Sequence, residues 1–179
     1  LAGLAFTPEV YAAGASFVGP SNLFTLLNSI PPYWESVRRQ FDYFVGDPKD
    51  AADEERMRRQ SPLFSVEKMR APLMVVQGAN DPRVKQAASD QIVEAYRNRG
   101  QAVEYVVAAD EGHGFARPDN RLAAMLALER FLHRYVGSEL QKGAPKWMEE
   151  KLEKLTKGGT ISVEGTTKSK TPSGSAGGE

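Results

Sequence analysis

The chain has 179 residues, which fits one domain of ordinary size, and 41% of them are hydrophobic, enough for a buried core. Because 23 Lys and Arg balance 23 Asp and Glu, the sequence predicts neither a nucleic-acid-binding surface nor an acidic tail. The absence of Cys excludes disulfides, thiolate metal sites and cysteine catalysis. No apolar run approaches the ~18–20 residues of a membrane span, so we expect no membrane partner. Composition does not distinguish a cytoplasmic from a periplasmic location.

The first seventy residues contain two short apolar segments and one long polar one. Residues 1–6 (LAGLAF) predict the end of a buried helix, and residues 11–18 predict a short buried strand that stops at Gly19 and Pro20. Residues 21–70 show no strand pattern, so we expect helical pieces there. Between the strands of an α/β protein, such an excursion is expected to form a cap or a pocket wall.

Strand and helix patterns alternate from residue 73 to residue 136. Residues 73–77 form a continuous apolar run, typical of a strand buried on both faces, and residues 102–108 predict a second strand. Residues 85–99 and 120–136 predict helices. The alternation favours parallel strands with right-handed crossovers, which is an α/β fold. The first helix is expected to bury Ala88, Ile92 and Tyr96, and the second to bury Leu122, Met125, Leu128, Leu132 and Tyr135.

The periodic pattern weakens after Gly137, which is expected to end the second helix. Residues 138–157 are interpreted as a helical extension, in which a short amphipathic helix surrounds Trp147, Leu152 and Leu155. Residues 158–179 are rich in Gly, Ser, Thr and Lys and are expected to be disordered.

An acid and a histidine follow the two predicted strands at one edge of the sheet. Asp81 comes shortly after the first strand and His113 shortly after the second. Because functional groups gather at the carboxyl ends of parallel strands, and neighbouring strands are ~4.8 Å apart, we expect the two side chains to meet. A carboxylate bonded to one imidazole nitrogen fixes the tautomer and stabilises the imidazolium that forms when the other nitrogen takes a proton from a serine. Asp before His is the order of an α/β-hydrolase triad.

Each of these two residues also has a plainer interpretation. Asp81 lies between Asn80 and Pro82, which is ordinary turn chemistry. His113 is harder to explain in this way, because glycines flank it on both sides and give it an exposed mount. The second histidine of the chain, His133, lies within the predicted helix 120–136 and is expected on a partly exposed face.

Two segments carry a resemblance to a known family, namely 76–84 (VQGANDPRV) and 110–115 (DEGHGF). They resemble the acid and base loops of the prolyl oligopeptidase family of serine peptidases, above all its dipeptidyl-peptidase and acylaminoacyl-peptidase branch. Weaker resemblances lie in the segments 1–4, 19–22, 31–35 and 89–93. The resemblance covers residues 1–137 and implies the C-terminal part of an α/β-hydrolase domain, a mostly parallel sheet with flanking helices.

The resemblance implies roles for five residues. Asp81 is similar to the triad acid and His113 to the triad base. Val84 resembles a hydrophobic wall of the pocket for the residue that precedes the scissile bond. Tyr33 and Trp34 fall in the region that supplies aromatic pocket walls in the family, although ordinary packing of the helical excursion would explain them equally well. Chemistry of this kind needs no metal and no cofactor.

The nucleophile of such an enzyme is not found in this sequence. No Gly-x-Ser-x-Gly precedes Asp81, and Ser21 and Ser89 lack the strained strand-to-helix mount of a nucleophile. By the family pattern, Leu1 falls shortly after the missing serine. We therefore expect an N-terminal part of the same protein to supply the nucleophile elbow, the oxyanion donor and a β-propeller. That part and a peptide substrate are the expected partners, and the isolated chain is predicted to be inactive.

Three functions are compatible with these residues. The prediction is a serine peptidase that hydrolyses short peptides through an acyl-enzyme. A carboxylic-ester hydrolase would use the same acid and base loops, and a propeller-like run of repeated strands upstream would distinguish the peptidase from it. A hydrolase-like interaction module without catalysis is the third possibility, and its sign would be a whole gene that lacks the serine elbow.

Overall fold

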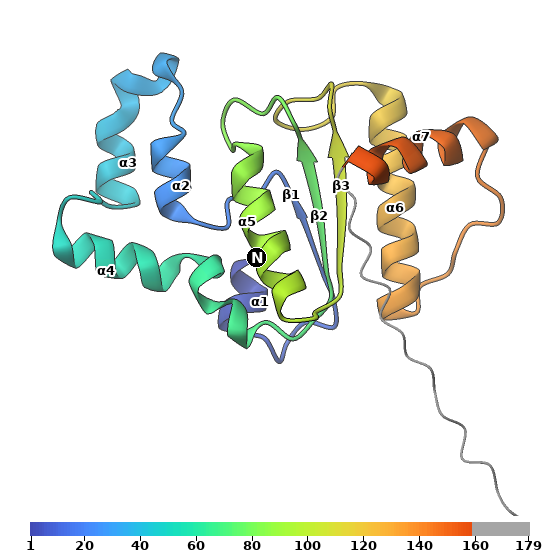
Figure 1. Ribbon diagram of the computed structural model, residues 1–179, viewed down its shortest axis with the longest axis horizontal. Coiled ribbons are helices and arrows are strands. Elements are labelled where there is room, and N and C mark those ends of the chain that lie inside the picture. Colours follow the sequence, from blue (N-terminus) through green and yellow to red (C-terminus); the bar gives the residue numbers. More distant parts are fainter. Residues whose placement is uncertain (159–179) are drawn as a thin grey trace, which may run out of the picture.

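The computed structural model describes residues 1–158 and has a three-stranded parallel sheet at its centre (Figure 1). Strand β1 (Gly14–Phe17) pairs with β2 (Leu73–Gly78), and β2 pairs with β3 (Val103–Ala108), so the strand order is β1-β2-β3. The parallel α/β arrangement predicted from the sequence is confirmed. The strand predicted over 11–18 is shorter than expected, because bonding to the β2 segment begins only at Gly14, whose N–H donates to the carbonyl of Pro72 (3.0 Å).

Helices cover both faces of this sheet, and consecutive side chains of β2 alternate between them. Val75 belongs to one core, shared with α1 (Ala2–Phe6) and α5 (Gln86–Asn98). Val76 belongs to the other core, shared with α6 (Pro118–Val136) and α7 (Lys146–Gly158). All six residues of β2 are buried, which explains its nearly unbroken apolar run. The predicted inner face of the first helix is confirmed, since α5 buries Ala88, Ile92 and Tyr96.

The chain between β1 and β2 is helical, as predicted for residues 21–70. It contains α2 (Leu23–Asn28), the 3₁₀ helix η1 (Pro32–Val37), α3 (Arg38–Phe44), α4 (Ala51–Gln60) and the 3₁₀ helix η2 (Pro62–Lys68). The side chains of Asn22 and Asp50 cap α2 and α4 by accepting backbone N–H bonds of the first turn. In Figure 1, α2, α3 and α4 lie on one side of the molecule, beyond α5.

The buried face of α6 differs from the one predicted. Three of the five apolar residues that it buries in the core are alanines: Ala123, Ala124 and Ala127, with Leu126 and Phe131. Leu122, Met125 and Leu132 were expected in the core but are 45%, 42% and 37% exposed. Leu128 and Tyr135 are partly buried beside the cluster. The prediction was wrong for the three exposed residues because it favoured large side chains, whereas alanines let the helix approach the sheet closely.

The C-terminal extension predicted over 138–157 contains one helix. Helix α6 ends at Gly137, which adopts a left-handed conformation (φ +76°). Helix α7 then lies across α6, where it buries Leu152 and Leu155 as expected, while Trp147 is 46% exposed (Figure 1). The disordered tail predicted over 158–179 lies outside the described residues, except for Gly158 at the end of α7.

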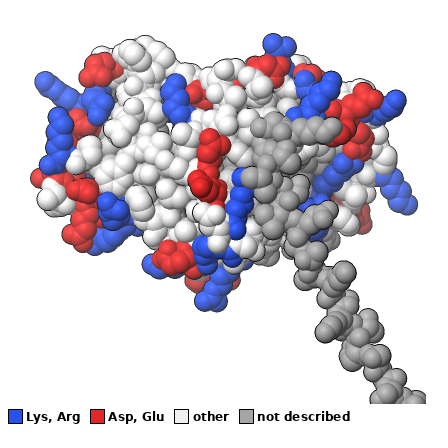
Figure 2. Space-filling model, in the orientation of Figure 1, with Lys and Arg blue, Asp and Glu red and all other residues white. Residues whose placement is uncertain are grey.

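Charged side chains of both signs are mixed on the surface. On the face shown in Figure 2, Lys and Arg lie beside Asp and Glu along the edges, and side chains of both signs also lie near the middle of the view. The chain as a whole carries no net formal charge. Within residues 1–158, no helix combines the length and the apolar character that crossing a bilayer requires.

Candidate active site

The loops after β2 and β3 bring Asp81 and His113 together, as the sequence predicted. Atom Nδ1 of His113 lies 2.8 Å from Oδ2 of Asp81. Since the two strands are parallel neighbours, both loops leave the sheet at the same edge. An ionised carboxylate can only accept a hydrogen bond, so this contact places the imidazole proton on Nδ1. Nε2 is then the ring nitrogen that can take a proton from another group.

Asp81 is buried and its carboxylate is fixed in place by backbone donors. The residue is 2% exposed. Its Oδ1 accepts the N–H groups of Arg83 (2.8 Å) and Val84 (2.9 Å), and these bonds form the turn that leads into α5. Its Oδ2 accepts the bond from His113. The carboxylate therefore offers the histidine one oxygen in a defined orientation.

Gln77 is a buried residue beneath the acid that was not predicted as part of the site. Its Nε2 donates to the carbonyls of Gly78 and Val84 (both 3.0 Å) and lies 3.4 Å from Oδ2 of Asp81. Its Oε1 accepts the hydroxyl proton of Ser89 from α5 (2.8 Å). The side chain thus holds the acid loop against α5. The available signal in the sequence is a polar residue at the end of an apolar strand, although the apolar run 73–77 itself includes Gln77.

The acid loop and the base loop are in direct backbone contact. The N–H of Asn80 donates to the carbonyl of Glu111 (2.9 Å), and its side-chain amide donates to the carbonyl of Ala109 (2.7 Å). Gly78 makes this approach possible, because a Cβ there would lie 2.2 Å from the carbonyl oxygen of Gly112. The pair Asp81 and His113 is therefore held by the backbone as well as by its own hydrogen bond.

His113 lies on an accessible part of its loop. Its side chain is 31% exposed, whereas that of Asp81 is fully buried. Gly114 has a φ of +90°, a conformation that side-chain-bearing residues rarely adopt, so the turn after the histidine requires glycine. The arrangement joins a buried acid to a solvent-facing imidazole, which is what proton transfer to and from a bound substrate needs.

The three residues predicted to line a substrate pocket lie in different environments. Val84 is 5% exposed, and its backbone takes part in the acid loop. Trp34 is half-buried and lies under the guanidinium of Arg83 (5.4 Å to the ring centroid), so η1 contacts the acid loop. Tyr33 is 62% exposed and makes an edge contact with Trp34 (6.0 Å between centroids). The structure brings Trp34 and Val84 to the acid loop and leaves Tyr33 at the surface.

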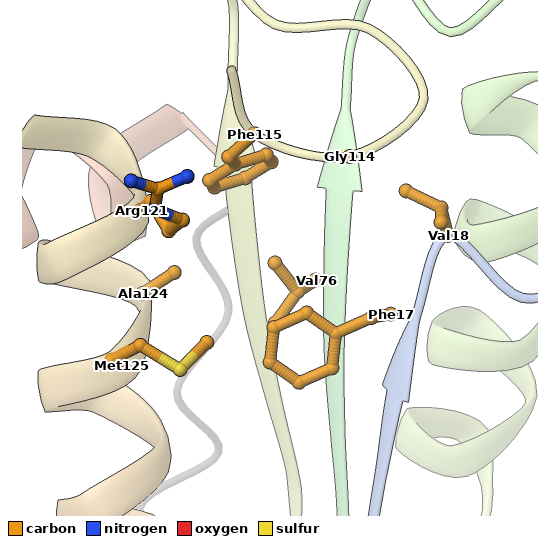
Figure 3. Close-up of a pocket in the computed structure, with 8 residues that line it drawn as sticks. All are labelled: Phe17, Val18, Val76, Gly114, Phe115, Arg121, Ala124 and Met125. Carbon is orange, nitrogen blue, oxygen red and sulfur yellow. The ribbon is translucent and has the colours of Figure 1, made fainter. Parts of the chain in front are cut away.

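A small apolar pocket of about 160 Å³ opens beside the base loop (Figure 3). Its walls come from the end of β1, from Val76 of β2, from the base loop and from α6, and none of them was predicted: Phe17, Val18, Val76, Gly114, Phe115, Arg121, Ala124 and Met125. Val18 has a φ of 47°, which is unusual for a β-branched residue and marks a sharp turn after β1. Within residues 1–158, no three His, Asp or Glu side chains are grouped as a metal site would require.

Comparison with known proteins identifies close relatives. Dipeptidyl aminopeptidase BIII of Pseudoxanthomonas mexicana is 48% identical over 141 residues, which are 79% of this chain and 20% of that protein. Dipeptidyl peptidase family member 6 of Caenorhabditis elegans is 42% identical over 146 residues, 81% of this chain and 20% of the relative. The chain therefore spans about a fifth of the length of these relatives.

The solved structure of a puromycin hydrolase superposes with a TM-score of 0.69 at 27% identity, covering 79% of this chain and 21% of that one. The sheet described above is thus a partial α/β-hydrolase fold. Residues 1–139 match the profile of the prolyl oligopeptidase family, and this match includes both loops of the candidate site. The chain belongs to the prolyl oligopeptidase family of serine peptidases.

Proposed function

We propose that this chain carries the acid and the base of a serine peptidase that hydrolyses short peptides through an acyl-enzyme. The observation that supports this most strongly is the 2.8 Å contact between a buried Asp81 and an accessible His113, at the carboxyl ends of adjacent parallel strands. Both relatives named above are called dipeptidyl peptidases or aminopeptidases, which favours peptides over simple esters as substrates.

In the proposed reaction, His113 acts first as general base and then as general acid. Its Nε2 takes the hydroxyl proton of a serine as the serine oxygen attacks the scissile carbonyl, and gives that proton to the leaving amine when the C–N bond breaks. A water molecule then attacks the ester in the same way, with the proton passing through His113 back to the serine. Asp81 keeps Nδ1 protonated and stabilises the imidazolium that forms in each half.

The serine itself is proposed to come from a part of the whole protein that this chain does not include. The second edge of β1 supports this, because it is unpaired among the described residues and a further strand can pair there. The pocket beside that edge is lined by Phe17 and Val18 of the β1 end together with Gly114 and Phe115 of the base loop (Figure 3). The base loop therefore reaches across β2 toward β1. If a further strand paired with the free edge of β1, the loop after that strand would lie near His113.

The residues proposed to contact the substrate are the three predicted from the sequence. Trp34 and Val84 lie at the acid loop, and Tyr33 is accessible next to Trp34. We propose that these side chains form part of the wall around the residue that precedes the scissile bond. Apolar and aromatic walls with few polar groups are typical of such pockets.

The proposal is tested by comparing the isolated chain with the whole protein from the same gene. A fluorophosphonate probe and a dipeptidyl p-nitroanilide substrate report the nucleophile and the turnover. We expect no labelling and no turnover by the 179-residue chain. In the whole protein, Asp81→Asn should lower kcat by about 10⁴-fold, and His113→Ala should abolish labelling as well as turnover.

His133→Ala is the matched control, because His133 is exposed on α6 away from the acid loop. It should leave kcat within a few-fold of the unmodified protein. Turnover by the isolated chain that His113→Ala removes would contradict the missing nucleophile. Full activity of the whole protein with His113→Ala would contradict the role of the histidine.

A further inference from the structure

Glu111 is a buried carboxylate next to the site, and the proposed reaction gives it no chemical role. It is 3% exposed. Its Oε2 accepts the N–H of Ala116 (2.9 Å), and its Oε1 accepts the N–H of Arg117 (2.9 Å) and the side-chain amide of Asn120 (2.8 Å). Three charge-assisted hydrogen bonds offset the cost of removing a carboxylate from water.

These bonds close the base loop into an arch. Glu111 precedes His113 in the chain, and its two backbone partners, Ala116 and Arg117, follow His113. The side chain therefore connects the start of the loop to its end, and the histidine lies on the segment between them. An isolated antiparallel β-bridge between the backbones of Gly112 and Gly114 narrows the arch on either side of the histidine.

The position of Glu111 explains why a carboxylate is used here. Arg117 is the N-cap residue of α6, and its side chain makes no capping hydrogen bond to the backbone N–H groups of the first turn. Asn120 belongs to the same turn, and its amide donates to both Glu111 and Asp110. The N-terminus of the 19-residue helix favours negative charge, so the carboxylate is stabilised where an amide would not be.

The backbone of the same residue reaches the acid loop. The carbonyl of Glu111 accepts the N–H of Asn80 (2.9 Å), the residue before Asp81. A Cβ on Gly78 would lie 2.6 Å from this carbonyl oxygen, which shows how closely the two loops approach. Glu111 thus joins the arch that carries the base to the turn that carries the acid.

Glu111 is not placed to exchange a proton with a substrate. Both of its carboxylate oxygens already accept hydrogen bonds from the loop and from α6, and the residue is buried. The imidazole instead makes its carboxylate contact with Asp81. The role left for Glu111 is to hold the arch in its shape.

We propose that Glu111 is the positioning residue of the base, and that its three bonds keep Nδ1 of His113 directed at Oδ2 of Asp81. The consequence for catalysis rests on the proposed function, whereas the positioning itself is a property of the isolated chain. A glutamine at this position turns one carboxylate oxygen into an N–H₂ group. That group would face a backbone N–H or the Asn120 amide, and one bond of the arch would be replaced by donor–donor repulsion.

The test measures the imidazole directly by nuclear magnetic resonance of the isolated chain. In the unmodified chain we expect a downfield, exchange-protected Nδ1–H proton of His113, with ring nitrogen shifts of a single tautomer. In Glu111→Gln this proton should be lost to solvent exchange and the tautomers should mix, while the other amide resonances stay dispersed. Glu55→Gln, at an exposed position of α4, is the matched control and should leave the signal intact.

Asn120→Ala keeps the carboxylate and removes one of its three donors, so it tests the arch if Glu111→Gln does not fold. It should broaden the Nδ1–H signal. An unchanged signal in the folded Glu111→Gln variant, or in Asn120→Ala where Glu111→Gln is unfolded, would overturn the proposal. In the whole protein, Glu111→Gln should lower kcat by up to about 10²-fold with little change in KM. The resonance experiment uses no substrate, so it can succeed or fail independently of the peptidase proposal.

Discussion

Gly78 ends β2 at the point where the acid loop and the base loop come closest. Main-chain atoms of the base loop occupy the space that a side chain at this position would need. A Cβ would lie 2.2 Å from the carbonyl oxygen of Gly112 and 2.6 Å from that of Glu111. Backbone cannot rotate away as a flexible side chain can. We therefore expect Gly78→Ala to push the two loops apart, to lower the free energy of unfolding by about 1–3 kcal/mol, and to lengthen the contact between Asp81 and His113.

Gly112→Ala is the matched control for this substitution. A Cβ on Gly112 would have no neighbour closer than 3.9 Å, so the free energy of unfolding should change by less than about 0.5 kcal/mol. Urea unfolding of both variants, followed by circular dichroism, measures the difference. Equal stability of the two variants would show that the loops separate without cost.

The residues of the site differ in how well the sequence reveals them. Asp81 and His113 could be predicted, because strand ends are visible in the apolar pattern and parallel strands bring their ends together. Gln77 and Glu111 could not, because their partners are backbone groups and side chains distant in the chain or buried within a loop. A buried polar residue is recognisable only when its burial is known, and that requires the packed structure.

Helix α7 shows how an element beyond the family match contributes to stability. It follows the matched residues 1–139, and it buries Leu152 and Leu155 in the core on the α6 side of the sheet. Its ion pairs with α6, Arg130 with Glu149 and Lys151 with Asp119, are between a quarter and a half exposed. Exposed pairs contribute about 0–1 kcal/mol, so apolar burial should dominate the attachment of α7.

We therefore expect Leu152→Ala to lower the free energy of unfolding by about 2–3 kcal/mol, whereas Glu149→Gln should lower it by less than Leu152→Ala does. Leu140→Ala is the control, since Leu140 is 40% exposed outside the helix, and it should cost less than about 0.5 kcal/mol. Thermal unfolding of the three variants ranks their losses of stability. A larger loss from Glu149→Gln than from Leu152→Ala would mean that charge, and not packing, holds α7.

At the level of elements, periodicity predicted the strands and helices well and the inner face of α6 poorly. The long helices and buried strands have strong patterns, and their bounds agree closely with those expected. In α6, however, apolar residues occupy both the alanine face toward the sheet and the face of Leu122 and Met125. A helix that is apolar on two faces has no single period to follow, and only the neighbouring sheet decides which face is buried.

The two outer strands of the sheet, β1 and β3, differ in what packs against them. Helix α7 contacts β3, while the second edge of β1 has no partner within residues 1–158. Phe17 and Met125 are both partly exposed and line the pocket beside the unpaired edge of β1. Such grouping of apolar residues marks a contact surface. It agrees with a chain that spans about a fifth of its relatives, and with the proposal that a further strand binds there.

The free energy of unfolding should also fall at alkaline pH because two tyrosines are buried. Burial raises the pKa of Tyr96 to about 12 from an ordinary value of 10.0, although nearby Arg99 opposes the shift. Burial and a hydrogen bond to Asp90 also raise the pKa of Tyr105. The unfolded chain releases the Tyr96 proton near pH 10, whereas the folded chain keeps it until about pH 12. The stabilisation from this group is therefore complete below pH 10 and is lost as the pH rises to about 12.

Tyr96→Phe removes this contribution, and only a long hydrogen bond from its hydroxyl to the carbonyl of Ala71 (3.4 Å) is lost at neutral pH. Between about pH 10 and pH 12, the unmodified chain should lose up to about 2–3 kcal/mol more unfolding free energy than Tyr96→Phe. Tyr43→Phe is the control, since it removes the hydroxyl of a tyrosine that is 80% exposed. Urea unfolding at both ends of this pH range measures the effect. Parallel pH profiles for the unmodified chain and Tyr96→Phe would mean that the phenol ionises equally in the folded and unfolded states.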